Sequence, residues 1–321
     1  VNVFSQEKLF YINKQSDIIA TKDKKNTCGL FLNNYHYNEI ISERPNKISC
    51  IIPFFNRNIN LDLEKFDFYN NIQVVSKNST GEEYIDLKPN LLSYKLHLNN
   101  NVIGILNFVN NSIVASFKIK NKQYEISEYN NEYILFETAN SINKSSFSCA
   151  VQDQHNNNRS FDYLPEMNSN PSAPVCVELA IEIDNYTRQT FSTDQETLDW
   201  ALAIIAGVSQ VYESETNSAI QVVYSYIWNT TDPYDSYVAQ ASAMLSELKN
   251  YWITNNAGVN RDLVHLLTKR NNTGTGGIAY VDALCSSNWG YGFSASLSND
   301  TTFVFPNPTY SWNLNVVAHE I

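Results

Sequence analysis

Hydrophobic and polar residues alternate in short runs along the first 148 residues of the chain. A period of two indicates strands that bury one face, and the Asn-rich stretches between the runs indicate turns. We therefore expect this half to be an antiparallel β domain. Its expected strands lie in KISCIIPFF, NIQVVS, LLSYKLHL, NVIGILNFV, SIVASFKI, KQYEISEY and EYILFE.

The alternating pattern stops between Val151 and Val175, where Asn, Ser and Pro accumulate. Segments of this composition connect folded units and are exposed. We place the domain boundary here. The expected organisation is a β-rich domain at 1–150, a linker at 151–175 and a second domain at 176–321.

The second half alternates between strand and helix patterns. VELAIEI is almost continuously apolar, as is typical of an interior strand. Two long helices are expected, at 192–215 and at 236–255, and the strands AIQVVYSYIW and DLVHLLT complete a β-α-β-α-β order. This order predicts an α/β domain with a mostly parallel, mixed sheet, so that the whole chain is a two-domain α+β/α/β protein. GGIAYVDAL, YGFSASLS and a short helix that begins near Trp312 complete the unit.

The first long helix has a recognisable start. Thr193 is followed three residues later by Glu196, the spacing of a capping box. The expected apolar face of this helix comprises Leu198, Ala201, Ile205, Val208 and Val211.

Composition and charge narrow the possible functions. The 321 residues suit two domains, and 22 Lys and Arg against 33 Asp and Glu give a net charge of -11. We therefore expect no nucleic-acid partner. No run of apolar residues approaches the length of a membrane helix, and the first residues lack both Met and a signal-peptide pattern. The five cysteines form an odd set, so at least one is a free thiol, a metal ligand, or paired outside the chain.

The candidate chemistry lies in the last residues, WNLNVVAHEI. Leu314, Val316, Val317 and Ile321 would form the buried face of a helix that carries His319 and Glu320. If two more residues and a His followed, the motif would be H-E-x-x-H, which holds zinc between two imidazoles one turn apart. Zinc activates water, and the Glu accepts its proton. The alternative is an amphipathic helix end with incidental polar residues.

Four segments occur in the order of a known family: VELAIEIDNY, RDLVHLLTKR, GGIAYVDALC and NVVAHEI. With them, residues 176–321 resemble the reprolysin (adamalysin) branch of the metzincin zinc endopeptidases. The resemblance implies that His319 is the first zinc ligand and Glu320 the general base. It also implies that the domain continues past Ile321, where the other two His would lie.

Further roles follow from the same resemblance. Glu178 and Asp262 match positions that in some reprolysins hold a structural Ca²⁺; the alternatives are a strand-end charge and a turn or cap residue. Cys285 matches a cysteine whose partner would lie after Ile321. The segment 276–280 would be an edge strand that binds a peptide substrate by main-chain hydrogen bonds, or else an ordinary edge strand. Its residues are Gly276, Gly277, Ile278, Ala279 and Tyr280.

The first domain shows a looser likeness, because residues 112–137 resemble the reprolysin propeptide. Cys149, in SFSCAVQD, then stands in the region of the cysteine switch, where a thiolate would bind zinc and keep the enzyme latent. The alternative is a structural disulfide of Cys149 with Cys28, Cys50 or Cys176. Within this domain we expect Cys28 to pair with Cys50.

The sequence is therefore interpreted as a secreted, latent zinc endopeptidase. Its expected partners are protein or peptide substrates and its own propeptide as an intramolecular inhibitor. Its expected cofactors are Zn²⁺ and, at the second site, Ca²⁺. Of the other histidines, His265 lies in an apolar strand and is expected to be a hydrogen-bonded core residue. The rival interpretation is a non-catalytic adhesion or binding protein with a degenerate protease-like domain.

Overall fold

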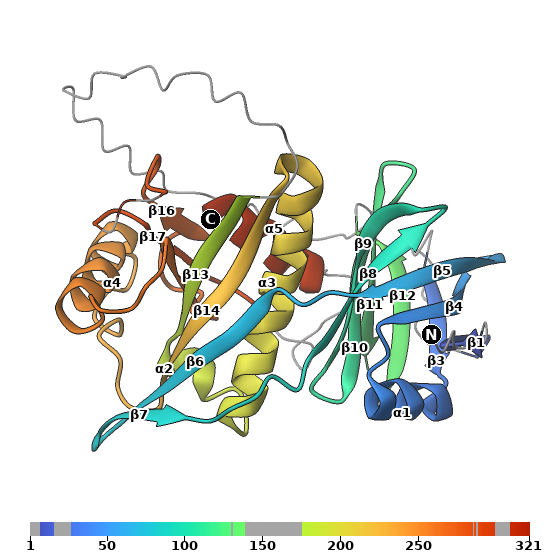
Figure 1. Cartoon of the computed structure of the whole chain (residues 1–321), viewed down its shortest axis with the longest axis horizontal. Coiled ribbons are helices and arrows are strands. Elements are labelled where there is room, and N and C mark those ends of the chain that lie inside the picture. The colour runs from blue at the N-terminus through green and yellow to red at the C-terminus, as the bar shows by residue number, and fades with distance from the viewer. Residues whose placement is uncertain are drawn as a thin grey trace.

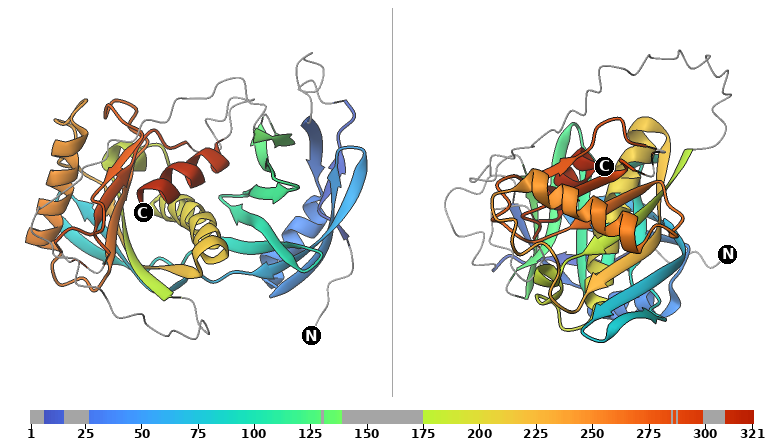
Figure 2. Two further views of the ribbon diagram at one scale, coloured as in Figure 1. Left: turned by 90° about the horizontal axis from the view of Figure 1, so that it is seen from above. Right: turned by 90° about the vertical axis from the view of Figure 1, so that its left-hand side faces the viewer.

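The protein folds around two β-sheets with helices between and outside them. The computed structural model describes residues 7–15, 27–129, 131–138, 175–284, 286, 288–298 and 309–321. Figure 1 shows the layers in order: one helix, a seven-stranded sheet, two helices, and a second, ten-stranded sheet. The left view of Figure 2 shows the same helices lying between the two sheets.

The ten-stranded sheet closes on itself. Its two outermost strands, β1 and β2, are successive parts of one segment, and they pair with β4 and β3 respectively. We call this closed sheet the barrel; the helix α1 (Asn34–Glu43) packs on it through Ile40. The barrel strands are β1 (Glu7–Lys8), β2 (Phe10–Ile12), β3 (Thr27–Leu32), β4 (Lys47–Phe54), β5 (Arg57–Lys65), β8 (Leu92–Leu98), β9 (Asn101–Val109), β10 (Ser112–Ile119), β11 (Lys122–Tyr129) and β12 (Glu132–Glu137).

The Asn-rich stretches between the barrel strands are tight hairpin turns, as the sequence predicts. In the turn between β9 and β10, Asn110 and Asn111 have φ of 50° and 63°. Asn99 and Asn100 repeat this between β8 and β9, with φ of 53° and 65°. Two successive positive φ angles match the twist of paired strands, and Asn tolerates them better than other non-glycine residues.

The seven-stranded sheet is mostly parallel, with an antiparallel strand at each edge, in the order β16-β17-β15-β13-β14-β6-β7. Two of its strands come from the first half of the chain: β6 pairs in parallel with β14, and β7 pairs with β6. The strand NIQVVS was expected in the antiparallel domain, but it lies here. The strands are β6 (Tyr69–Asn78), β7 (Gly81–Ile85), β13 (Val175–Ile183), β14 (Ser218–Trp228), β15 (Leu263–Leu267), β16 (Gly277–Ala279) and β17 (Tyr291–Ser294).

Helices cover both faces of this sheet. On one face lies α4 (Ala241–Asn255); on the other lie α3 (Asp194–Thr216) and α5 (Tyr310–Glu320), while α2 (Asn185–Arg188) follows β13. The barrel packs against the outer side of α3 and α5 through Ile105, Val109 and Val114. As a result α3 is buried all round from Thr197 to Gln210, instead of along the single face expected.

The N-termini of α3 and α4 can be compared with the positions predicted from the sequence. Thr193 caps α3 by accepting from the Glu196 amide at 3.1 Å, and the Glu196 carboxylate accepts from the Ser192 amide. The second long helix was expected from Ser236, but α4 starts at Ala241. The reason is Ala239, whose φ of 55° interrupts helical geometry.

The expected disulfide between Cys28 and Cys50 is wrong. Both are free, buried thiols in the barrel core. They lie on β3 and β4, which are not neighbours in the sheet. Cys28 pairs across the ladder with Leu135, and Cys50 pairs with Leu61 and Glu7. Cys176 is free and exposed. Cys149, Cys285 and the linker at 151–174 lie outside the described residues, so the expected domain boundary stays a prediction.

Candidate active site

The helix α5 carries His319 and Glu320, and it packs tightly on α3. Leu314, Val316 and Val317 are buried, as the sequence predicts. The close approach depends on Gly207 in α3: a Cβ there would collide with the Leu314 side chain and lie 2.8 Å from the Tyr310 hydroxyl. This contact sets the distance between α5 and α3.

A carbonyl group in the last turn of α5 is hydrogen-bonded to α3. The Tyr212 hydroxyl on α3 donates to the Ala318 carbonyl oxygen at 3.0 Å. Carbonyl groups in the last turn of a helix have no partner within the helix, so this bond satisfies one of them. It also fixes the position of the adjacent residues, His319 and Glu320.

His319 and Glu320 differ in exposure. His319 is exposed, whereas Glu320 is 4% exposed and turns toward the edge strand β16. A Cβ at Gly277 would lie 2.7 Å from the Glu320 carboxyl carbon. The carboxyl group therefore occupies the space that the missing side chain of Gly277 leaves, and this glycine is required by close approach.

The structure places the segment expected to bind substrate at the end of the sheet. Gly277, Ile278 and Ala279 form β16, which pairs with β17 and is the outermost strand among the residues that the structure describes. Gly276 and Tyr280 flank it, and their backbone groups bond to Ala295 and Tyr291. The structure thus brings the expected edge strand and Glu320 into contact.

A cavity of about 490 Å³ adjoins these residues. His319, Glu320, Ala279 and Tyr280 line part of it, and its whole described lining comes from residues 177–321. His265 also lines it, yet this residue is 1% exposed and hydrogen-bonds to the Ser294 hydroxyl at 2.9 Å. Burial lowers the pKa of His265 to about 3, so the imidazole stays neutral. The expectation of a hydrogen-bonded core histidine is confirmed.

Glu178 and Asp262 lie together, as the calcium hypothesis requires, but both make protein contacts. Asp262 accepts from the Glu178 amide at 2.8 Å, and Glu178 accepts from the Asn260 side chain at 3.0 Å. Among the described residues, no three His, Cys, Asp or Glu side chains gather as metal ligands. Asp262 thus bonds to a main-chain amide of β13, and calcium binding stays a prediction.

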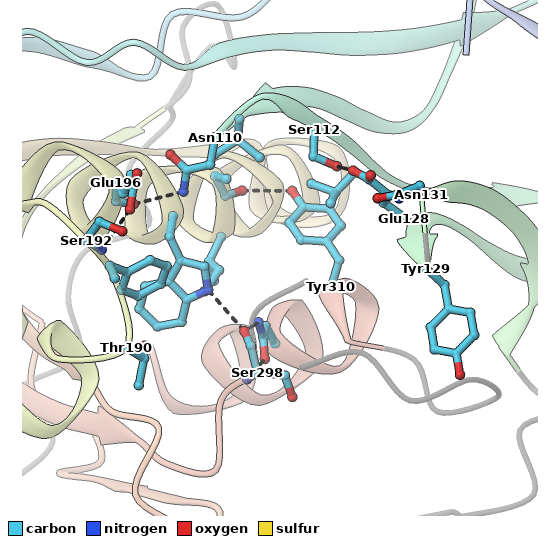
Figure 3. Close-up of a pocket in the computed structure, with 17 residues that line it drawn as sticks. Asn110, Ser112, Glu128, Tyr129, Asn131, Thr190, Ser192, Glu196, Ser298 and Tyr310 are labelled. Carbon is cyan, nitrogen blue, oxygen red and sulfur yellow. Dashed lines mark hydrogen bonds between the residues drawn. The ribbon is translucent and has the colours of Figure 1, made fainter. Parts of the chain in front are cut away.

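A second cavity, of about 510 Å³, lies between the barrel and the helices (Figure 3). Polar bonds surround it: Asn110 donates to the Glu196 carbonyl at 3.0 Å, and Tyr310 donates to the Ala203 carbonyl at 2.8 Å. Apolar side chains from both parts, such as Trp200, complete its wall. The cavity marks the junction of the two halves and is lined by a different set of residues from that around Glu320.

A cluster of buried, oppositely charged side chains also lies at the carboxyl ends of β13, β14 and β15. It was not predicted from the sequence. Arg270 donates to Asp184 at 2.6 Å, to Asp232 at 2.9 Å and to Asp235 at 2.6 Å. Asp184 and Asp232 are buried, and Asp184 also caps α2. These four residues follow the ends of three different strands and lie far apart in the sequence, so no local motif predicts the cluster.

Glu182 lies on β13, two residues before Asp184, and is fully buried. Its carboxylate accepts from the Trp228 indole and the Tyr234 hydroxyl, each at 2.6 Å, and from the Trp252 indole. Burial raises its pKa to about 7, although these three neutral donors act in the opposite direction. This carboxylate lies on the α4 face of the sheet, away from Glu320.

Comparison with known proteins identifies the class. Residues 174–321 match the family model Reprolysin_5, described as metallo-peptidase family M12. The resemblance expected from the sequence is thus confirmed for residues 174–321, which are similar to metallopeptidases of family M12. No curated protein matches the chain.

A solved structure is also similar. Metalloproteinase-II from Bacteroides fragilis has a TM-score of 0.45 and 10% sequence identity, with 86% of this chain and 79% of that chain covered. This score is too low to establish a shared fold, so the family match carries the assignment.

Proposed function

We propose that residues 176–321 form part of the catalytic domain of a secreted zinc endopeptidase, with His319 as a zinc ligand and Glu320 as the general base. The observation that carries the proposal is the match of residues 174–321 to family M12. The position of Glu320 supports it, because this buried carboxyl group lies beside a free sheet edge and lines a cavity.

The number of zinc ligands in a catalytic site bears on the proposal. A catalytic zinc site uses three protein ligands, whereas the described residues bring two imidazoles to this cavity. That of His265 is buried and hydrogen-bonded to Ser294, so His319 is the candidate ligand among them. We therefore propose that the chain ending at Ile321 does not hold zinc by itself, and that the other two ligands are His residues after Ile321. Bound zinc would lower the pKa of a coordinated water toward about 7.

The residues present have two roles in the proposed reaction. Glu320 is held against Gly277 at the cavity wall, where it would accept a proton from attacking water. The strand β16 would bind an extended peptide through its main-chain groups, because among the described strands nothing pairs with its outer edge. These two features together would place a peptide bond next to the carboxylate.

Latency and activation are also proposed. Residues 1–150 would act as an inhibitory propeptide, with Cys149 as a zinc ligand, and cleavage within 151–175 would release the block. Among the described residues no helix is long and apolar enough to cross a membrane. A structural Ca²⁺ is proposed at Glu178 and Asp262, whose carboxylates suit that ion.

The test compares two variants of a chain that continues through the residues after Ile321. Glu320→Gln should lower the hydrolysis of a fluorescent casein substrate by at least about 100-fold, with one zinc per chain retained by metal analysis. Glu215→Gln, at an exposed position in α3, is the control and should leave activity unchanged. The chain ending at Ile321 should bind no stoichiometric zinc.

Two results would contradict the proposal. Retained activity in Glu320→Gln would remove this residue as the base. Absence of both zinc binding and hydrolysis in the longer chain would favour the rival function, a binding protein with a degenerate protease-like domain.

A further inference from the structure

Glu125, on the barrel strand β11, is 0% exposed and points away from the barrel toward the first turn of α5. One carboxylate oxygen, Oε1, accepts from the Thr309 amide at 3.1 Å and the Tyr310 amide at 3.3 Å. The other, Oε2, accepts from the Ser311 amide at 2.8 Å. The hydroxyls of Thr309 and Ser127 also donate to Oε1.

These hydrogen bonds satisfy the unpaired amides at the N-terminus of α5. The first amides of any helix have no partner within it, and they carry a partial positive charge that favours a carboxylate. The N-cap residue of α5, Thr309, makes no capping bond with its own side chain. Glu125 supplies that cap from a strand that lies 184 residues earlier in the chain.

The need is mutual, because a buried carboxylate is costly unless hydrogen-bonded. The described contacts of Glu125 are all hydrogen bonds from amides and hydroxyls, and they come mainly from α5. The barrel without α5 would therefore leave this group without most of its donors. The carboxylate and the helix end stabilise each other.

Other polar contacts surround this cap. The Ser116 hydroxyl lies 2.8 Å from the Ser311 hydroxyl, and Gln123 donates to Ser116 at 2.6 Å. Asn107 donates to the Tyr310 hydroxyl at 2.6 Å. All three barrel residues lie on neighbouring strands, so a single surface of the barrel contacts one turn of α5.

We propose that this surface of the barrel is a docking site for the N-terminus of α5, and that Glu125 is the positioning residue of the helix that carries His319 and Glu320. The barrel orients α5 from the end opposite to its candidate catalytic residues. The part of the inference that concerns catalysis rests on the proposed function, whereas the capping itself does not. In the uncleaved chain the barrel then contributes to the position of α5, in addition to any part it has in blocking the site.

The test measures hydrogen–deuterium exchange of the chain 1–321, which requires neither metal nor activity. In Glu125→Ala the amides of residues 309–311 should exchange about tenfold faster, and in Glu125→Gln, which keeps one acceptor oxygen, by a smaller factor. Exchange in the barrel strands β4 and β5 should not change. Glu43→Gln, at an exposed position in α1, is the control.

A second variant separates positioning from general packing. Thr309→Asp gives α5 a carboxylate cap of its own, so in the Glu125→Ala background it should restore slow exchange of the following amides. Unchanged exchange at 309–311 in folded Glu125→Ala or Glu125→Gln would overturn the proposal, as would failure of this rescue. Should Glu125→Ala not fold, the rescue by Thr309→Asp and the exchange of Glu125→Gln decide it.

Failure here is distinct from failure of the proposed function. A chain whose Glu320→Gln variant stays active would still show the capping effect, because exchange reports the helix end alone. Conversely, unchanged exchange in the Glu125 variants would leave the role of Glu320 untouched.

Discussion

The interior of the barrel and the seven-stranded sheet bury different kinds of residue, although Glu125 is buried on the outer face of the barrel against α5. The barrel core consists of aliphatic and aromatic side chains and two thiols. The seven-stranded sheet and its connections bury Glu182, Asp184, Asp232 and Arg270. A core without charge depends little on pH or on single polar partners, whereas buried charges are costly as soon as one partner is lost. We therefore expect the stability of the sheet that carries the candidate site to depend more on pH, and on single polar side chains, than the stability of the barrel does.

The largest effect is expected at Arg270. Replacement by Met removes the cation that faces Asp184 and Asp232, and should lower the free energy of unfolding by about 3–5 kcal/mol, measured by chemical denaturation. The control is Arg57→Met in the barrel, where the exposed guanidinium lies over the Phe54 ring and should contribute less than about 1 kcal/mol. Equal losses in the two variants would contradict the comparison.

A smaller effect is expected from pH through Glu182. Its pKa is about 7 in the folded protein against an ordinary value of 4.5, so the folded state binds the proton more tightly than the unfolded state. The stability from this group is therefore present at low pH and falls as pH rises from about 4.5 to about 7, by up to about 1.4 kcal/mol per unit.

Two other groups titrate in part of that range. Burial raises the pKa of Asp199 to about 6, which acts in the same direction. The lowered pKa of His265 acts in the opposite direction, because the unfolded chain binds that proton more tightly below about 6.5. The measurement is therefore the difference between wild type and Glu182→Gln in denaturation at pH 5 and pH 7.5. No pH dependence in that difference would show that Glu182 is not the source.

The smallest effect concerns the thiols, and it tests the closed barrel core. In a chain with Cys149→Ser and Cys285→Ser, one thiol, that of Cys176, should react rapidly with a disulfide reagent. Cys28 and Cys50 should react at least about 100-fold more slowly until denaturant is added, because burial raises the pKa of both, to about 12 for Cys50. A single reactive thiol even after denaturation without reductant would instead restore the disulfide hypothesis.

Features of the fold that depend on residues close together in the sequence could be predicted, whereas those that depend on distant residues could not. The barrel hairpins follow from local alternation and from Asn at the turns, so six of the seven expected strands lie where the sequence predicts, in the barrel. NIQVVS has the same alternation, but nothing local distinguishes a partner in β8 from one in β14. Its place in the other sheet depends on contacts about 150 residues away.

The candidate site shows the same limit. His319, Glu320 and the segment 276–280 were predicted through a family resemblance, and the structure brings Glu320 and Gly277 into contact. Glu125 was not predicted, since a Glu within a strand indicates nothing about a helix 184 residues later. A sequence signal does exist: Thr309 begins a helix with no acidic residue in its first turn, so the helix needs a cap from elsewhere.

The hairpin of β6 and β7 has a consequence for synthesis of the chain. Ser76 pairs with Ile227, so the ribosome adds about 150 residues between the two partners. At 5–20 residues per second, β6 waits roughly 8–30 seconds for β14. During that interval Val74 and Val75 have no sheet to join, which makes this hairpin a target for chaperones while the nascent chain is still growing.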